Sequence, residues 1–172
     1  SRGLGDVYKR QLGMDAGLLT TEGNHNIYIG TEAGAYNTTG DELILIGYRA
    51  GYAINDASSA DGTVAIGYTA GQALTSGGSN TVIGYQSGKS LTTSGNNVAI
   101  GYDSLISAVD GCNSHVAIGV QSLRYVDRGS NGSATVYGNV AVGYNALAGG
   151  DFVSADKDLV GNIAIGKNTL DA

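Results

Sequence analysis

The chain has 172 residues, a formal net charge of −6 and no cluster of basic residues, which excludes the basic face of a nucleic-acid-binding protein. Glycine accounts for 29 residues without a Gly-X-Y period, which excludes collagen, and proline and tryptophan are absent. No apolar run approaches the ~20 residues of a membrane-spanning helix, and the single cysteine, Cys112, excludes an intrachain disulfide.

The first segment, SRGLGDVYKRQ (1–11), does not fit the repeat that follows it. It holds Arg2, Lys9 and Arg10, three of the chain's nine basic residues. The stretch GLGDVYKRQ resembles the translation of a sequencing adaptor, as found at the ends of metagenomic reading frames. We therefore interpret 1–11 as an adaptor-derived, non-repeat lead-in, with a genuine irregular lead-in as the alternative. Residues 12–172 are expected to form a single repeat domain.

From residue 12 onward the chain repeats one short pattern, seen in NNVAIGYDSL (96–105), GNVAVGYNAL (138–147) and GNIAIGKNTL (161–170). Each unit is anchored by a glycine that follows an aliphatic residue. The nine anchors are Gly13, Gly30, Gly47, Gly67, Gly84, Gly101, Gly119, Gly143 and Gly166. Their spacings are 17, 17, 20, 17, 17, 18, 24 and 23, so the modal unit has 17 residues. Polar insertions at 54–62, 127–137 and 149–160 lengthen three units and are expected to form the most variable surface.

Two aliphatic residues lie two positions apart before most anchors, which is the period of a β-strand and not of a helix. Seventeen residues are too few for a strand–helix–strand unit but suit one coil of a solenoid. The sequence therefore predicts an all-β fold, a parallel β-solenoid or β-roll of about nine coils, with strands about 4.8 Å apart in a rod roughly 40 Å long. A recurring asparagine four positions before the anchor predicts a side-chain amide ladder of Asn26, Asn80, Asn97, Asn139 and Asn162.

The three residues before each anchor alternate between the two faces of the predicted strand. We expect the outer two, such as Val98 and Ile100, to fill the interior of the coil. The middle residue would then point outward, although it is small and apolar. We interpret this column as an oligomer seam, and the alternative is a second layer of the chain's own core. The seam would comprise Leu45, Ala65, Val82, Ala99, Ala117, Ala141 and Ala164.

Tyrosine follows the anchor in several units, which predicts a ladder of Tyr48, Tyr68, Tyr85, Tyr102 and Tyr144. Such a ladder either contacts a glycan or packs ring on ring. His25 and His115 have no carboxylate or nucleophile at a fixed offset, so we interpret them as turn residues. The sequence indicates no catalytic, cofactor-binding or metal-binding residue.

The pattern N-V-A-I-G-Y-x-[AS]-[GL] resembles the head repeats of trimeric autotransporter adhesins. It is also similar to the NxAIGYxAG-type repeats of phage tail-fibre proteins that carry an endosialidase-type intramolecular chaperone. The resemblance covers about residues 12–170 and implies left-handed β-rolls in which three chains pack side by side. The unit of 17 residues is longer than the adhesin-head repeat, which is a departure from that pattern.

We therefore expect a non-enzymatic segment of a trimeric fibre, either a phage tail fibre or a bacterial surface adhesin head. It would act as a rigid shaft and attach to a host or surface, outside the cell, on the cell surface or on a virion. Its partners would be two further copies of the chain and a host-cell-surface glycan or protein, without nucleic acid, cofactor or membrane embedding. The alternatives are an acyltransferase with a hexapeptide-type left-handed β-helix and an ice-binding solenoid.

Overall fold

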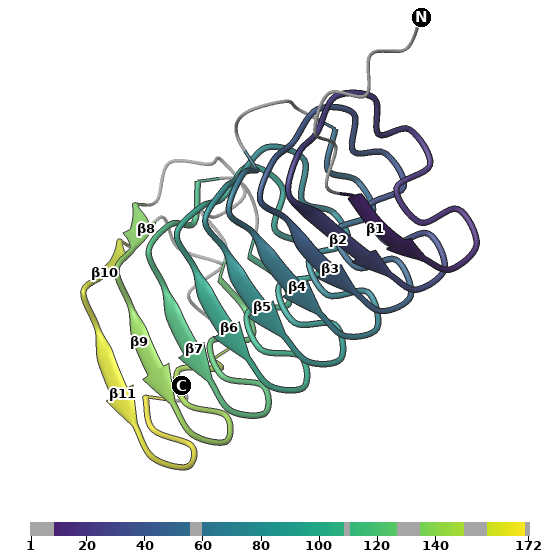
Figure 1. The fold of residues 1–172 in the computed structure, drawn as a ribbon. Helices are drawn as coiled ribbons and strands as arrows, with labels where there is room; N and C mark the ends of the chain where they lie inside the picture. The colour runs from purple at the N-terminus through teal and green to yellow at the C-terminus, as the bar shows by residue number, and fades with distance from the viewer. Residues whose placement is uncertain (1–8, 56–59, 109–110, 127–134, 150–157, 171–172) are drawn as a thin grey trace, which may run out of the picture.

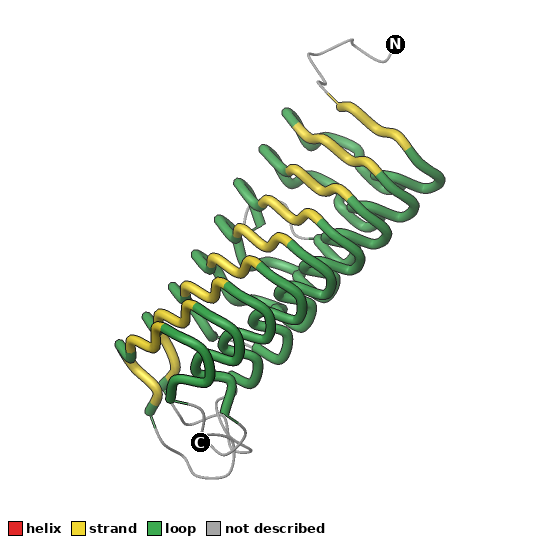
Figure 2. The backbone as a smooth tube through the Cα atoms, turned by 90° about the horizontal axis from the view of Figure 1, so that it is seen from below, coloured by secondary structure: helices red, strands yellow, loops and turns green. Residues whose placement is uncertain are grey.

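A computed structural model of the protein describes residues 9–55, 60–108, 111–126, 135–149 and 158–170. In these residues the chain winds into a rod of stacked coils, with strands along one side and loops along the others (Figures 1 and 2). The described residues contain no helix. The strands are β1 (Lys9–Leu12), β2 (Asn26–Ile29), β3 (Ile44–Ile46), β4 (Val64–Ile66), β5 (Thr81–Ile83), β6 (Val98–Ile100), β7 (Val116–Ile118), β8 (Val136–Tyr137), β9 (Val140–Val142), β10 (Leu159–Val160) and β11 (Ile163–Ile165).

One strand from each coil enters a nine-stranded parallel sheet, in the order β1-β2-β3-β4-β5-β6-β7-β9-β11. The register pairs like with like, so Val98 of β6 pairs with Val116 of β7, and Ile100 pairs with Ile118. The predicted all-β parallel solenoid is therefore confirmed. The short strands β8 and β10 come from the two long insertions near the C-terminus and form a separate parallel pair.

The anchor glycines lie in one file, with each directly against the anchor of the next coil. A Cβ atom placed on Gly30 would lie 2.6 Å from the carbonyl oxygen of Gly47, and one on Gly119 would lie 2.5 Å from that of Gly143. The anchors also have φ values between 125° and 139°, which only glycine adopts easily. Each corner of the coil therefore requires glycine for two reasons, backbone conformation and the close approach of the neighbouring coil.

A second set of backbone hydrogen bonds joins the coils on the side away from the sheet. The donor is the amide four residues after the anchor, and the acceptor is the carbonyl three residues after the next anchor. Gly88 donates to Ser104 at 2.9 Å, and Leu105 donates to Ser122 at 3.0 Å. Both sides of each coil are thus hydrogen-bonded to the next, which holds the rod in register.

The core runs as a single line between these two sides, and its members are the middle residues of the strands together with residues from the opposite segments. In the second coil the large Tyr28 fills this space, and its hydroxyl accepts a hydrogen bond from the buried Asn37 amide at 2.6 Å. Burial raises the pKa of the Tyr28 phenol above its usual value. The Tyr28 hydroxyl therefore enters the core together with a hydrogen-bond partner.

The first strand includes the last three residues of the expected lead-in. Lys9, Arg10 and Gln11 belong to β1, which pairs in register with β2 from Lys9 opposite Asn26 to Leu12 opposite Ile29. Parallel pairing uses backbone groups, so a strand can continue through residues whose side chains do not match the repeat. Residues 1–8, which make up most of the expected lead-in, lie outside the described part of the chain.

Candidate functional site

The expected oligomer seam is wrong, because the middle column of the strands lies inside the coil. Ala99 and its equivalents are fully or almost fully buried within the single chain: Leu45, Ala65, Val82, Ala117, Ala141 and Ala164. The alternative interpretation, that this column belongs to the chain's own core, is the correct one. The reason is the narrowness of the coil, which admits one side chain per strand from the sheet side and therefore turns the larger flanking pair outward.

The two flanking columns, which we expected in the interior, form the outer face of the sheet. Their members alternate with the buried column, so that β4, β5, β6 and β9 each have a half-buried, a buried and a half-buried residue in turn. Ile29 and Ile118 are each 37% exposed, and Ile163 and Ile165 in the last strand are each 67% exposed. The outward residues are Ile27, Ile29, Ile44, Ile46, Val64, Ile66, Thr81, Ile83, Val98, Ile100, Val116, Ile118, Val140, Val142, Ile163 and Ile165.

We call this set the aliphatic face. A strand face in contact with water is normally polar, but from β2 to β11 only Thr81 is polar in this set, and the equivalent position in β1 is Arg10. Neighbouring side chains of the ladder shield one another, which accounts for the half-burial of the inner coils. Ile163 and Ile165 have a neighbour on one side only and are correspondingly more exposed. The face is thus a continuous apolar stripe along the rod.

The predicted tyrosine ladder borders the aliphatic face and forms over four coils. Tyr48, Tyr68, Tyr85 and Tyr102 stack with ring centroids 5.1–5.2 Å apart and interplanar angles of 6–19°. The interior rings have both faces covered by neighbours, which leaves their edges exposed. A sugar ring stacks on an aromatic face, so the arrangement supports ring-on-ring packing and offers no face for a glycan at Tyr68 or Tyr85.

Tyr144 stands apart from this ladder. The coil between it and Tyr102 has Val120 at the equivalent position, so the stack ends at Tyr102. The ammonium group of Lys167 lies over the Tyr144 ring, 5.7 Å from its centroid. The structure therefore divides the five predicted tyrosines into a stack of four and one ring paired with a cation.

The asparagine column forms the predicted ladder from Asn80 to Asn162, with His115 as one of its rungs, whereas the side-chain oxygen of Asn26 accepts from the Leu43 backbone N–H. The Asn80 side-chain oxygen accepts the Asn97 backbone N–H at 3.0 Å, and the Asn97 oxygen accepts that of His115 at 2.9 Å. His115 Nδ1 then accepts the Asn139 backbone N–H at 3.2 Å. An unprotonated ring nitrogen thus takes the place of an amide oxygen. Burial lowers the pKa of His115 to about 4, which keeps the ring neutral.

His115 is therefore a ladder residue and not the turn residue that we expected. His25 fits that expectation better, since it is exposed and has φ of 56°. The two histidines come from coils whose strands, β2 and β7, are separated by four others in the sheet. They do not form one site.

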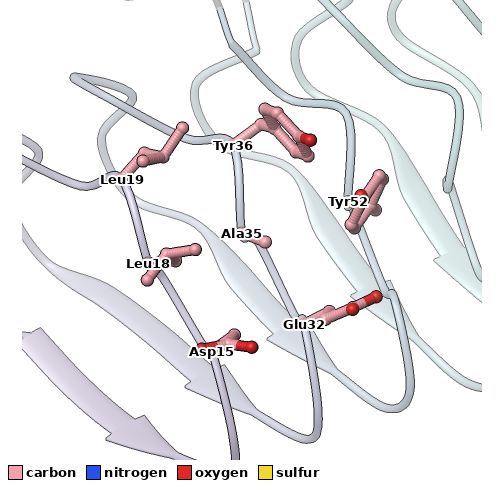
Figure 3. Close-up of a pocket in the computed structure, with 7 residues that line it drawn as sticks. All are labelled: Asp15, Leu18, Leu19, Glu32, Ala35, Tyr36 and Tyr52. Atoms are coloured by element: carbon pink, nitrogen blue, oxygen red, sulfur yellow. The ribbon is translucent and has the colours of Figure 1, made fainter.

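A cavity that the sequence did not indicate lies on the side of the rod away from the sheet (Figure 3). Its volume is about 310 Å³. The lining residues come from three successive coils and are Asp15, Leu18, Leu19, Glu32, Ala35, Tyr36 and Tyr52. In Figure 3 the strands lie behind these segments, so the cavity opens away from the aliphatic face.

The aromatic wall of the cavity consists of two tyrosines in an edge-to-face contact. The Tyr36 and Tyr52 ring centroids are 4.9 Å apart and the rings are inclined by 72°. The Arg49 guanidinium lies over the Tyr52 ring, 5.0 Å from its centroid, and forms an ion pair with Glu32. A hydrogen bond with Tyr36 is the largest of the causes that raise the pKa of Tyr52. Donors, acceptors and ring faces therefore surround one cavity.

Sequence reasoning missed this cluster because its members stand outside the conserved columns of the repeat. Tyr36 is six residues after its anchor, whereas Tyr52 is five residues after the next one. Only the stacking of coils brings these two positions together. A comparison of neighbouring units with one unit shifted by one residue would have placed Tyr36 opposite Tyr52.

The described residues contain no group of three or more His, Cys, Asp or Glu side chains that could hold a metal ion. A search of the same residues for a helix long and apolar enough to cross a membrane also finds none. Most of the three polar insertions lies outside the described residues. Comparison with family models, with curated proteins and with solved structures gives no match.

Proposed function

We propose that the chain is a non-enzymatic segment of a trimeric fibre, a phage tail fibre or a bacterial surface adhesin head, outside the cell or on a virion. It would act as a rigid shaft with a role in attachment to a host surface. The observation that carries this proposal is the aliphatic face, which runs along the sheet from β2 to β11 and which the described residues leave partly exposed. A continuous exposed apolar surface marks a site of contact with a partner.

A second copy of the same chain is the partner that fits this face. The side chains recur once per coil, at a spacing of about 4.8 Å along the rod. A partner that packs against every coil must share this spacing, and another copy shares it automatically. The number three comes from the resemblance of the repeat to trimeric adhesin heads and phage tail fibres.

In such an assembly the three sheets surround an axis parallel to the rods, and equivalent residues lie at equal heights. The aliphatic face becomes the common core, and the tyrosine ladder lies along its border. The sides away from the sheet remain in contact with solvent and are available to a host ligand. Stiffness follows from the two sets of backbone hydrogen bonds between coils.

Cross-linking at a single introduced cysteine tests this arrangement. Ile100→Cys places a thiol on the aliphatic face, whereas Gln72→Cys places one on the opposite side, and Cys112 is buried in both variants. With a short bis-maleimide, we expect Ile100→Cys to give covalently linked chains much faster than Gln72→Cys. Equal rates of linkage in the two variants would show that the aliphatic face is not the contact surface.

A further inference from the structure

We infer that the cavity bounded by Tyr36 and Tyr52 binds one neutral sugar ring. This inference rests on the proposed attachment role and assigns to it a ligand class and a site. The cavity volume of about 310 Å³ is at the small end for ligand sites, which suits a single ring better than a long chain. Tyr36 is 46% exposed, so its ring offers an open surface to the C–H groups of a pyranose.

The polar groups at the cavity can accept hydrogen bonds from sugar hydroxyl groups and can also donate hydrogen bonds to them. The carboxylates of Asp15 and Glu32 line the cavity and can only accept hydrogen bonds, and Arg49, which pairs with Glu32 beside the cavity, can only donate them. A sugar hydroxyl can do both, so neighbouring hydroxyls of one ring can use an acid and a base together. The apolar surfaces of Leu18 and Ala35 lie beside these groups and suit the C–H edges of the same ring.

The charges of the cavity disfavour the two charged alternatives. An acidic sugar would meet the carboxylates of Asp15 and Glu32 and be repelled. An organic cation would bind over the Tyr52 ring and beside the Glu32 carboxylate, but the Arg49 guanidinium already occupies this position. Like charges at such short range are destabilising, so a neutral polyol is the best fit.

The tyrosine ladder does not share these properties, although it has more rings. Its interior rings are covered on both faces by their neighbours. Tyr125 provides a closer comparison, because it stands six residues after its anchor, as Tyr36 does. It is exposed and has Arg124 over its ring at 5.0 Å, yet it does not line the cavity.

The position of the cavity keeps it open in the proposed trimer. It faces away from the strands, whereas the copies would meet at the aliphatic face (Figure 3). A trimer would therefore present three equivalent sugar sites on its outer surface. Weak binding at each site would be strengthened by simultaneous attachment to a surface carrying many glycans.

Saturation-transfer NMR on the whole chain tests the inference, with methyl glycosides of galactose, glucose, mannose and N-acetylglucosamine as probes. We expect at least one glycoside to bind, with Tyr36→Ala weakening its affinity about tenfold and Tyr125→Ala leaving it unchanged. Asp15→Asn is a second variant, since asparagine tolerates the φ of 56° at this exposed position. It should weaken binding severalfold without disturbing the fold.

Three outcomes would overturn the inference. One is the absence of a signal from every glycoside, another is equal loss of binding in Tyr36→Ala and Tyr125→Ala, and the third is binding of choline in place of the glycosides. The oligomeric state, measured on the same samples, separates this result from the proposed shaft. A trimer that binds no glycoside contradicts only the sugar site, whereas a monomer that binds one contradicts only the trimeric fibre.

Discussion

The coils of the two halves of the rod fill the same interior space with different residues. In the coil anchored by Gly84, the core holds Val82 and Leu91, and the fourth residue after the anchor is Gly88. In the next coil the middle strand residue is Ala99, and Leu105 takes the place of the glycine. A Cβ atom at Gly88 would lie 2.7 Å from Val82 and 2.8 Å from Leu91.

These two coils therefore fill a similar core volume with large residues at different positions. Leucine is buried seven residues after the anchor in the coils of Leu74 and Leu91, and four residues after it in those of Leu105 and Leu123. The second arrangement uses a positive φ of 51° at Leu105 and 48° at Leu123, where glycine would be unstrained. Burial of the leucine side chain offsets this strain.

The largest expected effect concerns a feature that the two halves share, the file of anchor glycines. Gly30→Ala in the first half and Gly119→Ala in the second would place a Cβ atom against a backbone carbonyl, at 2.6 Å and 2.5 Å. We expect Gly119→Ala to lower the free energy of unfolding by more than about 4 kcal/mol, because strain and a backbone clash act together. Urea denaturation at a fixed protein concentration measures this effect.

Gly166→Ala is the matched control for the anchor substitutions. Its φ of 126° is similar, but its Cβ would meet only a side-chain atom of Thr169, at 3.2 Å. We expect a loss of about 1–2 kcal/mol from strain alone. Similar losses at Gly119 and Gly166 would show that the anchors do not lie in close file.

The next prediction concerns variants that convert the core residues of the Gly84 coil into those of the Gly101 coil. Leu91→Ala alone should cost about 3 kcal/mol through a cavity, and Gly88→Leu alone about 2 kcal/mol through overpacking. The triple variant Val82→Ala, Gly88→Leu, Leu91→Ala reproduces the residues of the Gly101 coil. Its stability in urea should lie within about 1 kcal/mol of the wild type. Additive losses in the triple variant would contradict the idea of conserved volume.

The asparagine column also differs between the halves, since it contains the single histidine rung in the second one. The pKa of His115 is about 4 in the folded chain and about 6.5 in the unfolded chain. The unfolded chain therefore binds more protons between these values. Stability is fully present above pH 6.5 and falls as the pH is lowered toward 4, by about 3 kcal/mol in all.

His115→Asn restores the residue found in the neighbouring rungs and should remove this part of the pH dependence. His25→Asn, at the exposed histidine, is the control and should leave it in place. Urea denaturation between pH 4 and 7 measures both variants. Parallel stability curves for the wild type and His115→Asn would contradict the role of the neutral ring in the ladder.

The smallest expected effect compares the tyrosines of the two halves. Tyr68 and Tyr144 are exposed to a similar extent, 46% and 47%, but only Tyr68 has stacked rings on both sides. Tyr68→Ala should therefore cost about 1 kcal/mol more than Tyr144→Ala in thermal or urea unfolding. Equal losses at the two positions would show that stacking does not contribute to stability.

The sequence predicted the coil, the glycine file and the asparagine ladder from Asn80 onward, because each depends on residues that recur from one unit to another. It did not predict which face of the strand lies inside. A pattern such as Val98-Ala99-Ile100 is apolar on both faces, so its period of two does not distinguish them. Which face of the strand lies inside depends on the width of the coil interior. Residues of the opposite segment, such as Gly88 and Leu105, set that width.

The sugar site could not be predicted from the repeat for a related reason. Arg49, Tyr36 and Tyr52 are departures from the consensus, and each stands at a different offset from its anchor. Their proximity depends on how one coil lies against the next, a relation between units that a column-by-column comparison does not contain.

The central claim is that an apolar stripe on the outside of each rod is covered by two further copies of the chain. Sedimentation equilibrium of the wild-type protein at micromolar concentration tests it most directly. We expect a single species with three times the 17.3 kDa mass of one chain. A single species with the mass of one chain would contradict it.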